Sequence, residues 1–296
     1  MRQLSPQANV FPQNDDDNNR PKKGALSIMK VVENKVIPLR DIHETALVHP
    51  NAKLGKEVVI GPYAIIGENV ELGDRCIVGP HVVIEGWTKI GVGNKFYHGA
   101  TIGCEPQDLK FHGEKSYLVI EDYNTFRENV TISRGTEGGG GETRIGSNNL
   151  FMAYTHVAHD CQVGSHVVLA NATALAGHVV VEDRVVIGGL SGIHQFSKIG
   201  KMAMVGACTK VVKDIPPFVI VDGNPAKVAG INVVGLRRNG ISPEVRDEIK
   251  KAYRILYRSN LIINQAIEQM EQELQGSAEI DHFIRFLRNA ERGICR

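Results

Sequence analysis

The stretch IGPYAIIGENVELGDRCIVGP, residues 60–80, places an aliphatic side chain at every sixth position and a glycine directly after each one. A period of six fits neither the α-helix, which repeats every 3.6 residues, nor a half-buried strand, which repeats every two. It is typical of a solenoid whose short parallel strands, three to a coil, each turn one aliphatic side chain inward. Eighteen residues would then return the chain one layer along the axis, about 4.8 Å away.

The same period continues in both directions from this stretch. Every sixth position from residue 42 to residue 102 holds an aliphatic residue or phenylalanine. The phase is lost across 103–119 and returns unshifted at Ile120. After 133–144 it restarts one residue later, at Ile145, and continues to Val211. Both breaks indicate loops that leave the coil, and long excursions of this kind often carry binding groups.

The C-terminal residues follow a different period. Ser242-Pro243-Glu244 has the features of a helix start, with an N-cap, a proline at the first helical position and an acid in the first turn. Apolar residues then recur at helical spacing, which predicts three helices. The fold class we expect is an all-β left-handed parallel β-helix (a hexapeptide solenoid) with a C-terminal α-helical domain. The expected organisation is an extension over 1–40, the β-helix over 41–222 with loops at 103–119 and 133–144, a connection over 223–241 and the helical domain over 242–296.

Composition narrows the classes of function. The chain has 296 residues and a formal net charge of +1, so it lacks the positive field of a nucleic-acid-binding protein. No apolar run approaches the roughly 18 residues of a membrane-spanning helix, so no transmembrane segment is expected. The five cysteines are odd in number and form no CxxC pair, which argues against a disulfide framework and indicates a reducing compartment. The polar residues 1–40 predict a disordered or targeting extension.

A group of histidines marks the candidate site. THVAHDC, residues 155–161, contains His156 and His159 with Asp160 behind the second. If position plus 18 lies one coil above, His159 lies beneath Gly177 and beside His178. The same rule sets Gln195 above Gly177, beside His194. We therefore expect His159, His178 and His194 along one edge of the solenoid.

Three interpretations of these histidines remain open from the residues alone. They could be surface or core side chains without a function. They could hold zinc, but ligands must lie about 2.0–2.1 Å from one point, whereas successive coils are about 4.8 Å apart. The third interpretation is general base catalysis by His159, oriented by Asp160, with the Gly177 amide as an oxyanion donor. We expect no metal and no cofactor.

Several motifs resemble the UDP-N-acetylglucosamine 3-O-acyltransferases of the lipid A pathway. The resemblance covers roughly residues 42–296, and its motifs are QDLK (107–110), RENVTISRGT (127–136), THVAHDC (155–161), LAGH (175–178), HQF (194–196) and AYRILYRS (252–259). It implies a homotrimer with active sites between adjacent solenoids. It also implies transfer of an (R)-3-hydroxyacyl group from acyl carrier protein to the glucosamine 3-hydroxyl of UDP-N-acetylglucosamine, the first step of lipid A biosynthesis.

The resemblance also implies roles for individual residues. His159 matches the general base, Asp160 its orienting partner and Gly177 the oxyanion amide. The implied substrate-binding residues are Asp108, Lys110, His156, His178, His194, Gln195, Ala207, Asn232 and Arg238. The sequence departs from the bacterial pattern at Ser133, which replaces a frequent histidine, and at Val234, which replaces an acid.

Localisation and two other functions complete the expectations. The N-terminal extension is unlike the bacterial members, so a plant mitochondrion is preferred, with the bacterial cytoplasm as the alternative. An acetyl-coenzyme A-dependent hexapeptide acetyltransferase is the second candidate enzyme. A catalytically silent trimeric scaffold is the third candidate, and the intact His159-Asp160 pair argues against it.

Overall fold

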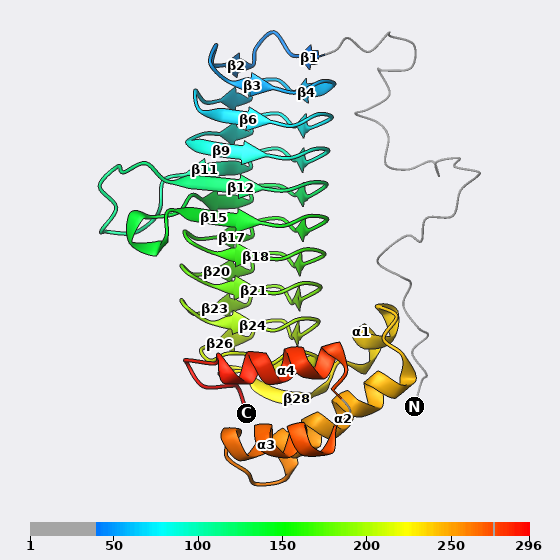
Figure 1. Cartoon of the computed structure of the whole chain (residues 1–296). Coiled ribbons are helices and arrows are strands. Elements are labelled where there is room, and N and C mark those ends of the chain that lie inside the picture. Colours follow the sequence, from blue (N-terminus) through cyan, green and yellow to red (C-terminus); the bar gives the residue numbers. More distant parts are fainter. Residues whose placement is uncertain (1–39, 275) are drawn as a thin grey trace, which may run out of the picture. The chain divides into compact units, whose positions relative to one another are not determined.

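The computed structural model describes residues 40–274 and 276–296. These residues belong to one compact unit, in which stacked coils of strand are followed by helices (Figure 1). The predicted extension over 1–40 lies outside the described residues, apart from Arg40. Within the described part of the chain, no helix is both long and apolar enough to span a membrane.

The strands form three sheets, and the chain visits each sheet in turn as it winds along the axis (Figure 1). The first sheet contains β1 (Arg40–Ile42), β4 (Val58–Ile60), β7 (Ile77–Val78), β10 (Lys95–Phe96), β13 (Thr125–Phe126), β16 (Leu150–Phe151), β19 (Val168–Leu169), β22 (Val186–Ile187), β25 (Met204–Val205), β27 (Val219–Asp222) and β28 (Lys227–Ile231). The second contains β2 (Leu47–Val48), β5 (Ile65–Ile66), β8 (Val83–Ile84), β11 (Thr101–Cys104), β14 (Thr131–Ser133), β17 (His156–Val157), β20 (Ala174–Leu175), β23 (Gly192–Ile193) and β26 (Lys210–Val211). The third contains β3 (Lys53–Leu54), β6 (Val70–Leu72), β9 (Trp87–Ile90), β12 (Tyr117–Ile120), β15 (Glu142–Ile145), β18 (Gln162–Val163), β21 (Val180–Val181) and β24 (Lys198–Ile199). This is the predicted left-handed parallel β-helix.

The strand register explains the phase of the sequence repeat. A regular coil pairs each residue with the one three hexapeptides later, as Ile60 pairs with Val78. Lys95 pairs with Thr125 instead of Gly113, so the first excursion inserts the length of two hexapeptides and the phase is kept. Thr131 pairs with His156 instead of Asn149, so the second excursion inserts one hexapeptide and a single extra position, which shifts the phase by one.

The two excursions are shorter than the expected loops, because strand pairing continues into both ends of each. The first excursion covers residues 105–116, between β11 and β12, and the second covers 134–141, between β14 and β15. The second contains a short 3₁₀ helix, η1 (Glu137–Gly139). Both leave the coil on the same side of the solenoid (Figure 1).

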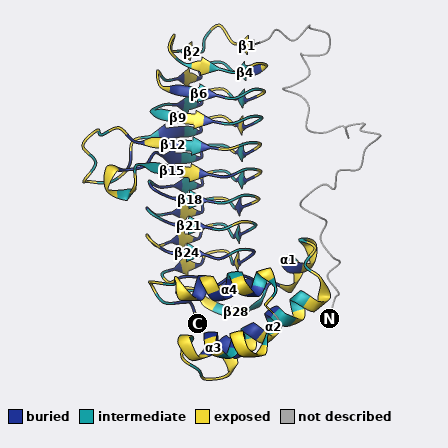
Figure 2. Cartoon of the chain, in the orientation of Figure 1, coloured by how far each residue is buried: buried dark blue, intermediate teal, exposed yellow. Residues whose placement is uncertain are grey.

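The inward positions of the hexapeptides make the core (Figure 2). Phe96, Phe126 and Phe151 stack directly on one another, with ring centroids 4.9 and 4.8 Å apart. Beside them, Asn124 donates to the Asn94 side-chain oxygen at 3.0 Å and accepts from the Asn149 amide at 2.9 Å. The first coil is less covered, and its Ile42 is 39 % exposed.

The corners of the coils hold residues with left-handed backbone geometry. Tyr63, Asp160, His178 and Phe196 all have φ between +58° and +64°. Such φ values are uncommon for residues other than glycine, so the sheet pairing on both sides of each corner must hold them. Residues at equivalent corners therefore stack in rows along the axis.

The C-terminal part has one more helix than the sequence predicts. Its helices are α1 (Val233–Arg238), α2 (Pro243–Arg258), α3 (Ile263–Glu273) and α4 (Ala278–Arg288). The predicted cap of α2 is confirmed, because the Ser242 hydroxyl accepts from the Val245 amide. The extra helix, α1, lies in the expected connection, where β28 also pairs antiparallel with β27. Phe283 of α4 stacks on Phe218 at 6.3 Å and thereby joins the helices to the last coil.

Truncating the central ring of the phenylalanine stack should destabilise the solenoid strongly. Phe126→Ala removes a fully buried ring between two others, so we expect the free energy of unfolding to fall by about 3–5 kcal/mol. Urea unfolding followed by circular dichroism measures the change. Leu109→Ala, at a fully exposed side chain, is the control and should stay within about 0.5 kcal/mol. Equal stability of the two variants would contradict the stacked core.

Candidate active site

His159 and Asp160 lie in the corner that follows β17. The His159 Nδ1 lies 2.7 Å from the Asp160 Oδ2, and the two side chains are 12 % and 0 % exposed. The carboxylate therefore fixes the ring orientation and leaves Nε2 as the nitrogen that can exchange a proton. A histidine held in this way has the geometry of a general base.

Gly177 lies directly against the His159 ring, as the coil arithmetic predicts. A Cβ added to Gly177 would lie 2.6 Å from Cε1 and 2.7 Å from Nε2, so only glycine fits beside the ring. Within the described residues the Gly177 amide donates no hydrogen bond. The Gly177 main chain therefore lies beside the proton-accepting nitrogen of His159.

His178 lies at the same corner as Asp160, one coil further along the solenoid. Its ring meets the His159 ring edge-on at 5.1 Å and stacks on Phe196 at 4.3 Å. Its Nε2 lies 3.9 Å from the Asp160 Oδ2. Burial lowers the pKa of His178, and the Asp160 carboxylate opposes that shift. Phe196 occupies the position one coil above His178, and His194 lies two residues before it on that coil.

His156 lies on the coil surface beside the pair. Its Nδ1 is 2.7 Å from the Thr131 hydroxyl, one coil below. Burial lowers the pKa of His156, and its proximity to His159 lowers it further. His156 is therefore held as a neutral ring within electrostatic reach of His159.

The first excursion brings two more predicted residues to this edge. The Asp108 carboxylate accepts from the Lys110 amide at 3.0 Å, which forms a tight turn. Both side chains influence the pKa of His178, Asp108 raising it and Lys110 lowering it. Lys110 is exposed, so its ammonium is available to an anionic ligand.

The remaining predicted residues are spread along the chain. His194 and Gln195 are exposed at the next coil, where the His194 Nδ1 contacts the Gln195 carbonyl at 3.1 Å. Ala207 is exposed and lies over Gly188, one coil further on. Arg238 is exposed at the end of α1. Within the described residues, no hydrogen bond or ion pair joins any of these to His159.

Asn232 has a structural role that the sequence did not reveal. It is buried, its side chain accepts from the Gly235 amide at 2.9 Å as the N-cap of α1, and it donates to the Met202 carbonyl at 2.9 Å. Both ends of this side-chain amide are therefore engaged within the chain.

A metal is not needed to explain the grouping of His159, Asp160 and His178. One ligand atom from each lies within 4.8 Å of the others, which is close enough to consider an ion. The carboxylate oxygen already accepts from His159 and from the Thr136 hydroxyl, at 2.7 and 2.6 Å. The Asp160 carboxylate thus lies at the centre of a hydrogen-bonded network.

The sequence interpretation missed two residues of the second excursion. Thr136 donates to Asp160, and Arg134 donates to the Gly103 carbonyl at 3.1 Å while its guanidinium lies 5.2 Å from the Phe111 ring centre. Arg134 therefore ties the second excursion to the first. The excursions have no repeat, so no periodic signal could have placed these contacts. Both residues lie in the RENVTISRGT motif (127–136) that carries the resemblance, but the motif gave them no role.

Cysteine is not the nucleophile of this site. Cys161 follows Asp160 directly, but burial raises the pKa of its thiol to about 12, and it donates to the Ala176 carbonyl at 3.1 Å.

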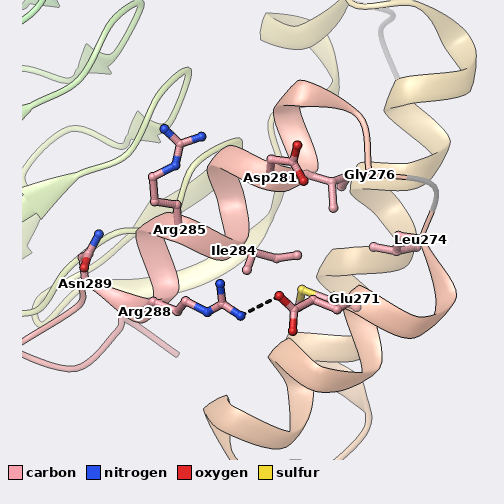
Figure 3. Close-up of a pocket in the computed structure, with 10 residues that line it drawn as sticks. Glu271, Leu274, Gly276, Asp281, Ile284, Arg285, Arg288 and Asn289 are labelled. Carbon is pink, nitrogen blue, oxygen red and sulfur yellow. Dashed lines mark hydrogen bonds and ion pairs between the residues drawn. The ribbon is translucent and has the colours of Figure 1, made fainter.

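A pocket between α3 and α4 lies apart from the histidines. It is lined by Leu274 and Ile284 among others, and an ion pair between Arg288 and Glu271 crosses it (Figure 3).

A hexapeptide β-helix with a carboxylate-oriented histidine on its edge defines a transferase of the hexapeptide class. Two family models match the chain, one described as "Bacterial transferase hexapeptide (six repeats)" over 51–86 and one as "Udp N-acetylglucosamine O-acyltransferase; Domain 2" over 214–295. The chain belongs to the UDP-N-acetylglucosamine O-acyltransferase family, because a relative of that name is 49 % identical to it over 86 % of the chain.

Individual relatives support that assignment over nearly their whole length. The acyl-[acyl-carrier-protein]–UDP-N-acetylglucosamine O-acyltransferase of Anaeromyxobacter dehalogenans is 49 % identical over 255 residues, covering 86 % of this chain and 99 % of the relative. The crystal structure of the Bacteroides fragilis UDP-N-acetylglucosamine acyltransferase matches with a TM-score of 0.84 and 42 % identity, covering 86 % of this chain and all of that one. The Arabidopsis UDP-N-acetylglucosamine acyltransferase matches with a TM-score of 0.77 and 35 % identity, covering 86 % and 100 %.

The lowered pKa of His156 predicts a pH dependence of stability. The unfolded chain binds a proton there near pH 6.5, whereas the folded chain binds it only at lower pH. As the pH falls below about 6.5, the unfolded state therefore takes up more protons and the free energy of unfolding decreases. In His156→Gln this part of the decrease should be absent. Melting temperatures between pH 5 and pH 8 measure it, and equal slopes for both proteins below pH 6.5 would refute the assignment.

Proposed function

We propose that this protein transfers an (R)-3-hydroxyacyl group from acyl carrier protein to the glucosamine 3-hydroxyl of UDP-N-acetylglucosamine. This reaction is the first step of lipid A biosynthesis. The observation that carries the proposal is the buried Asp160 carboxylate, which orients His159 beside the Gly177 amide in a chain of this family.

The reaction follows from these three groups. His159 Nε2 removes the proton from the 3-hydroxyl as the oxygen attacks the thioester carbonyl. The Gly177 N–H stabilises the negative oxygen of the tetrahedral intermediate. When the carbon–sulfur bond breaks, the leaving thiolate takes the proton from the imidazolium, whose charge Asp160 has balanced. No acyl-enzyme forms, which agrees with the inert Cys161 thiol.

Substrate binding is proposed for residues around the pair. Asp108 and Lys110 bind the sugar and phosphates from the first excursion, together with His156, His178 and Gln195 on the coil edge. His194 lines the path of the pantetheine or acyl chain. Arg238 and the backbone around Asn232 contact the nucleotide or the acyl cleft, and Ala207 closes the far end of the acyl groove.

Assembly and partners complete the proposal. A single solenoid edge supplies one wall of a cleft, so a homotrimer would supply the second wall from a neighbouring copy. Acyl carrier protein is acidic, and α2 offers a positive surface through Arg246, Lys251 and Arg254 that would steer it. Lys250 is less available, because it pairs with Asp247 at 2.7 Å.

We propose residence in a bacterial cytoplasm rather than in a plant mitochondrion. The mitochondrial expectation gains no support from the relatives, since Anaeromyxobacter supplies one at 49 % identity while the Arabidopsis protein is 35 % identical.

Removing the base should abolish most of the activity. We expect His159→Ala to lower kcat by about 10²–10⁴-fold, because a positioned base typically supplies that factor. The assay uses UDP-N-acetylglucosamine with (R)-3-hydroxyacyl carrier protein, and sedimentation checks that the variant assembles like the wild type. His166→Ala, at an exposed corner histidine outside the site, is the matched control and should keep the wild-type rate.

Three outcomes of this assay would count against the proposal. Turnover of acetyl-coenzyme A in place of the acyl carrier protein would favour the acetyltransferase. No turnover with either donor would favour a silent scaffold. Loss of activity with a chelator and recovery with zinc would replace the general base by a metal site.

The size of the side chain at position 207 is expected to limit the length of the acyl group that the enzyme prefers. Its methyl shortens the proposed groove relative to a glycine, so we expect Ala207→Gly to shift the preference toward a longer hydroxyacyl chain. Competition between acyl carrier proteins of graded chain length measures the shift as a ratio of kcat/KM values. Ala52→Gly in the first coil is the control. An unchanged ratio in Ala207→Gly would show that the groove ends elsewhere.

A further inference from the structure

The Asp160 carboxylate accepts three hydrogen bonds although its side chain is fully buried. Its side chain is 0 % exposed, and it accepts from three donors: His159 Nδ1, the Thr136 amide and the Thr136 hydroxyl. A buried carboxylate without such donors would be costly to keep charged. The orientation of the carboxylate that holds His159 therefore depends on Thr136.

Thr136 donates hydrogen bonds to both oxygens of the Asp160 carboxylate. Its amide donates to Oδ1 at 2.8 Å and its hydroxyl donates to Oδ2 at 2.6 Å. The second oxygen is the one that also accepts from His159, at 2.7 Å. Two donors from one residue block rotation of the carboxylate about its Cβ–Cγ bond, so Oδ2 stays aimed at the imidazole.

The rest of the second excursion is fitted to the same carboxylate. A Cβ added to Gly139 would lie 2.1 Å from the Asp160 Cγ, so the backbone of η1 packs directly against it. From the other side, the Asp160 amide donates to the Thr143 hydroxyl of β15 at 2.8 Å. The excursion therefore leaves the coil and returns in such a way that it encloses Asp160.

We propose that Thr136 is a positioning residue for the acyl transfer and that the excursion over 134–141 holds the Asp160 carboxylate in line with His159. This inference rests on the proposed function. Thr136 does not touch the substrate; it acts through Asp160. Its hydroxyl keeps the anion in one orientation, and that orientation keeps His159 Nε2 facing the substrate hydroxyl.

The kinetic test separates positioning from simple anchoring of the loop. Thr136→Val keeps the shape and the amide donor but removes the hydroxyl, and we expect kcat to fall about tenfold with the KM for UDP-N-acetylglucosamine within about twofold. Small misplacements of reacting groups carry losses of this size. Thr136→Ser retains the donor and should recover kcat to within about threefold of the wild type.

The matched control is another buried threonine of the solenoid. The Thr173 hydroxyl donates to the Gly188 carbonyl at 3.1 Å, so Thr173→Val also removes a buried hydrogen bond. It should lower stability without lowering kcat. If Thr136→Val raised KM and left kcat intact, or if Thr136→Ser lost as much kcat as Thr136→Val, the positioning role would be overturned.

A spectroscopic readout makes the inference independent of activity. Proton NMR of histidine-labelled protein should show the His159 Nδ1–H as a downfield signal, identified by its loss in His159→Ala. We expect this signal to shift or broaden in Thr136→Val and to persist in Thr136→Ser and Thr173→Val. An unchanged signal in Thr136→Val would overturn the inference, even in an enzyme whose activity is intact. An inactive wild type that shows the expected changes would instead contradict the proposed function.

Discussion

Every part of this structure depends on the parallel pairing of very short strands, most of them only two residues long. No single pair of such strands would be stable in water, because each contributes few hydrogen bonds and one buried side chain. Stacking makes the pairing cooperative, since each inward aliphatic residue is covered by the residue one coil above and one coil below. The same stacking repeats any surface position at a fixed interval along the axis. A row of side chains on the edge is thus as regular as the core.

That regularity explains how much of the fold and of the candidate site could be predicted from the sequence. The inward residues, the three-sheet coil and the contact between His159 and Gly177 all follow from the period. In a regular coil, the residue number determines the sheet, the coil and the side of the strand on which a side chain lies. The same rule sets Phe196 over His178, and the two rings do stack. The helix start at Ser242 was also readable, because its cap is a local interaction.

The features that could not be predicted are those in which the chain departs from the period. Thr136 and Arg134 belong to an excursion whose path is set by tertiary contacts with Asp160, Gly103 and Phe111. A pattern of residue types carries no record of such contacts. Asn232 was assigned to ligand binding by resemblance alone, whereas its side chain is engaged in capping α1 and bonding to Met202. Buried polar groups of this kind are paired according to the folded geometry and have no simple spacing.

The asparagine ladder of Asn94, Asn124 and Asn149 runs through the coils from which both excursions depart. It links three successive layers at one corner, while the extra residues leave and return at another. The coil therefore keeps its strand register across both excursions, although they differ in length. An excursion can therefore differ in length from its neighbour while the inward residues of the coils above and below it remain stacked. New chemistry can be added to such a scaffold one insertion at a time.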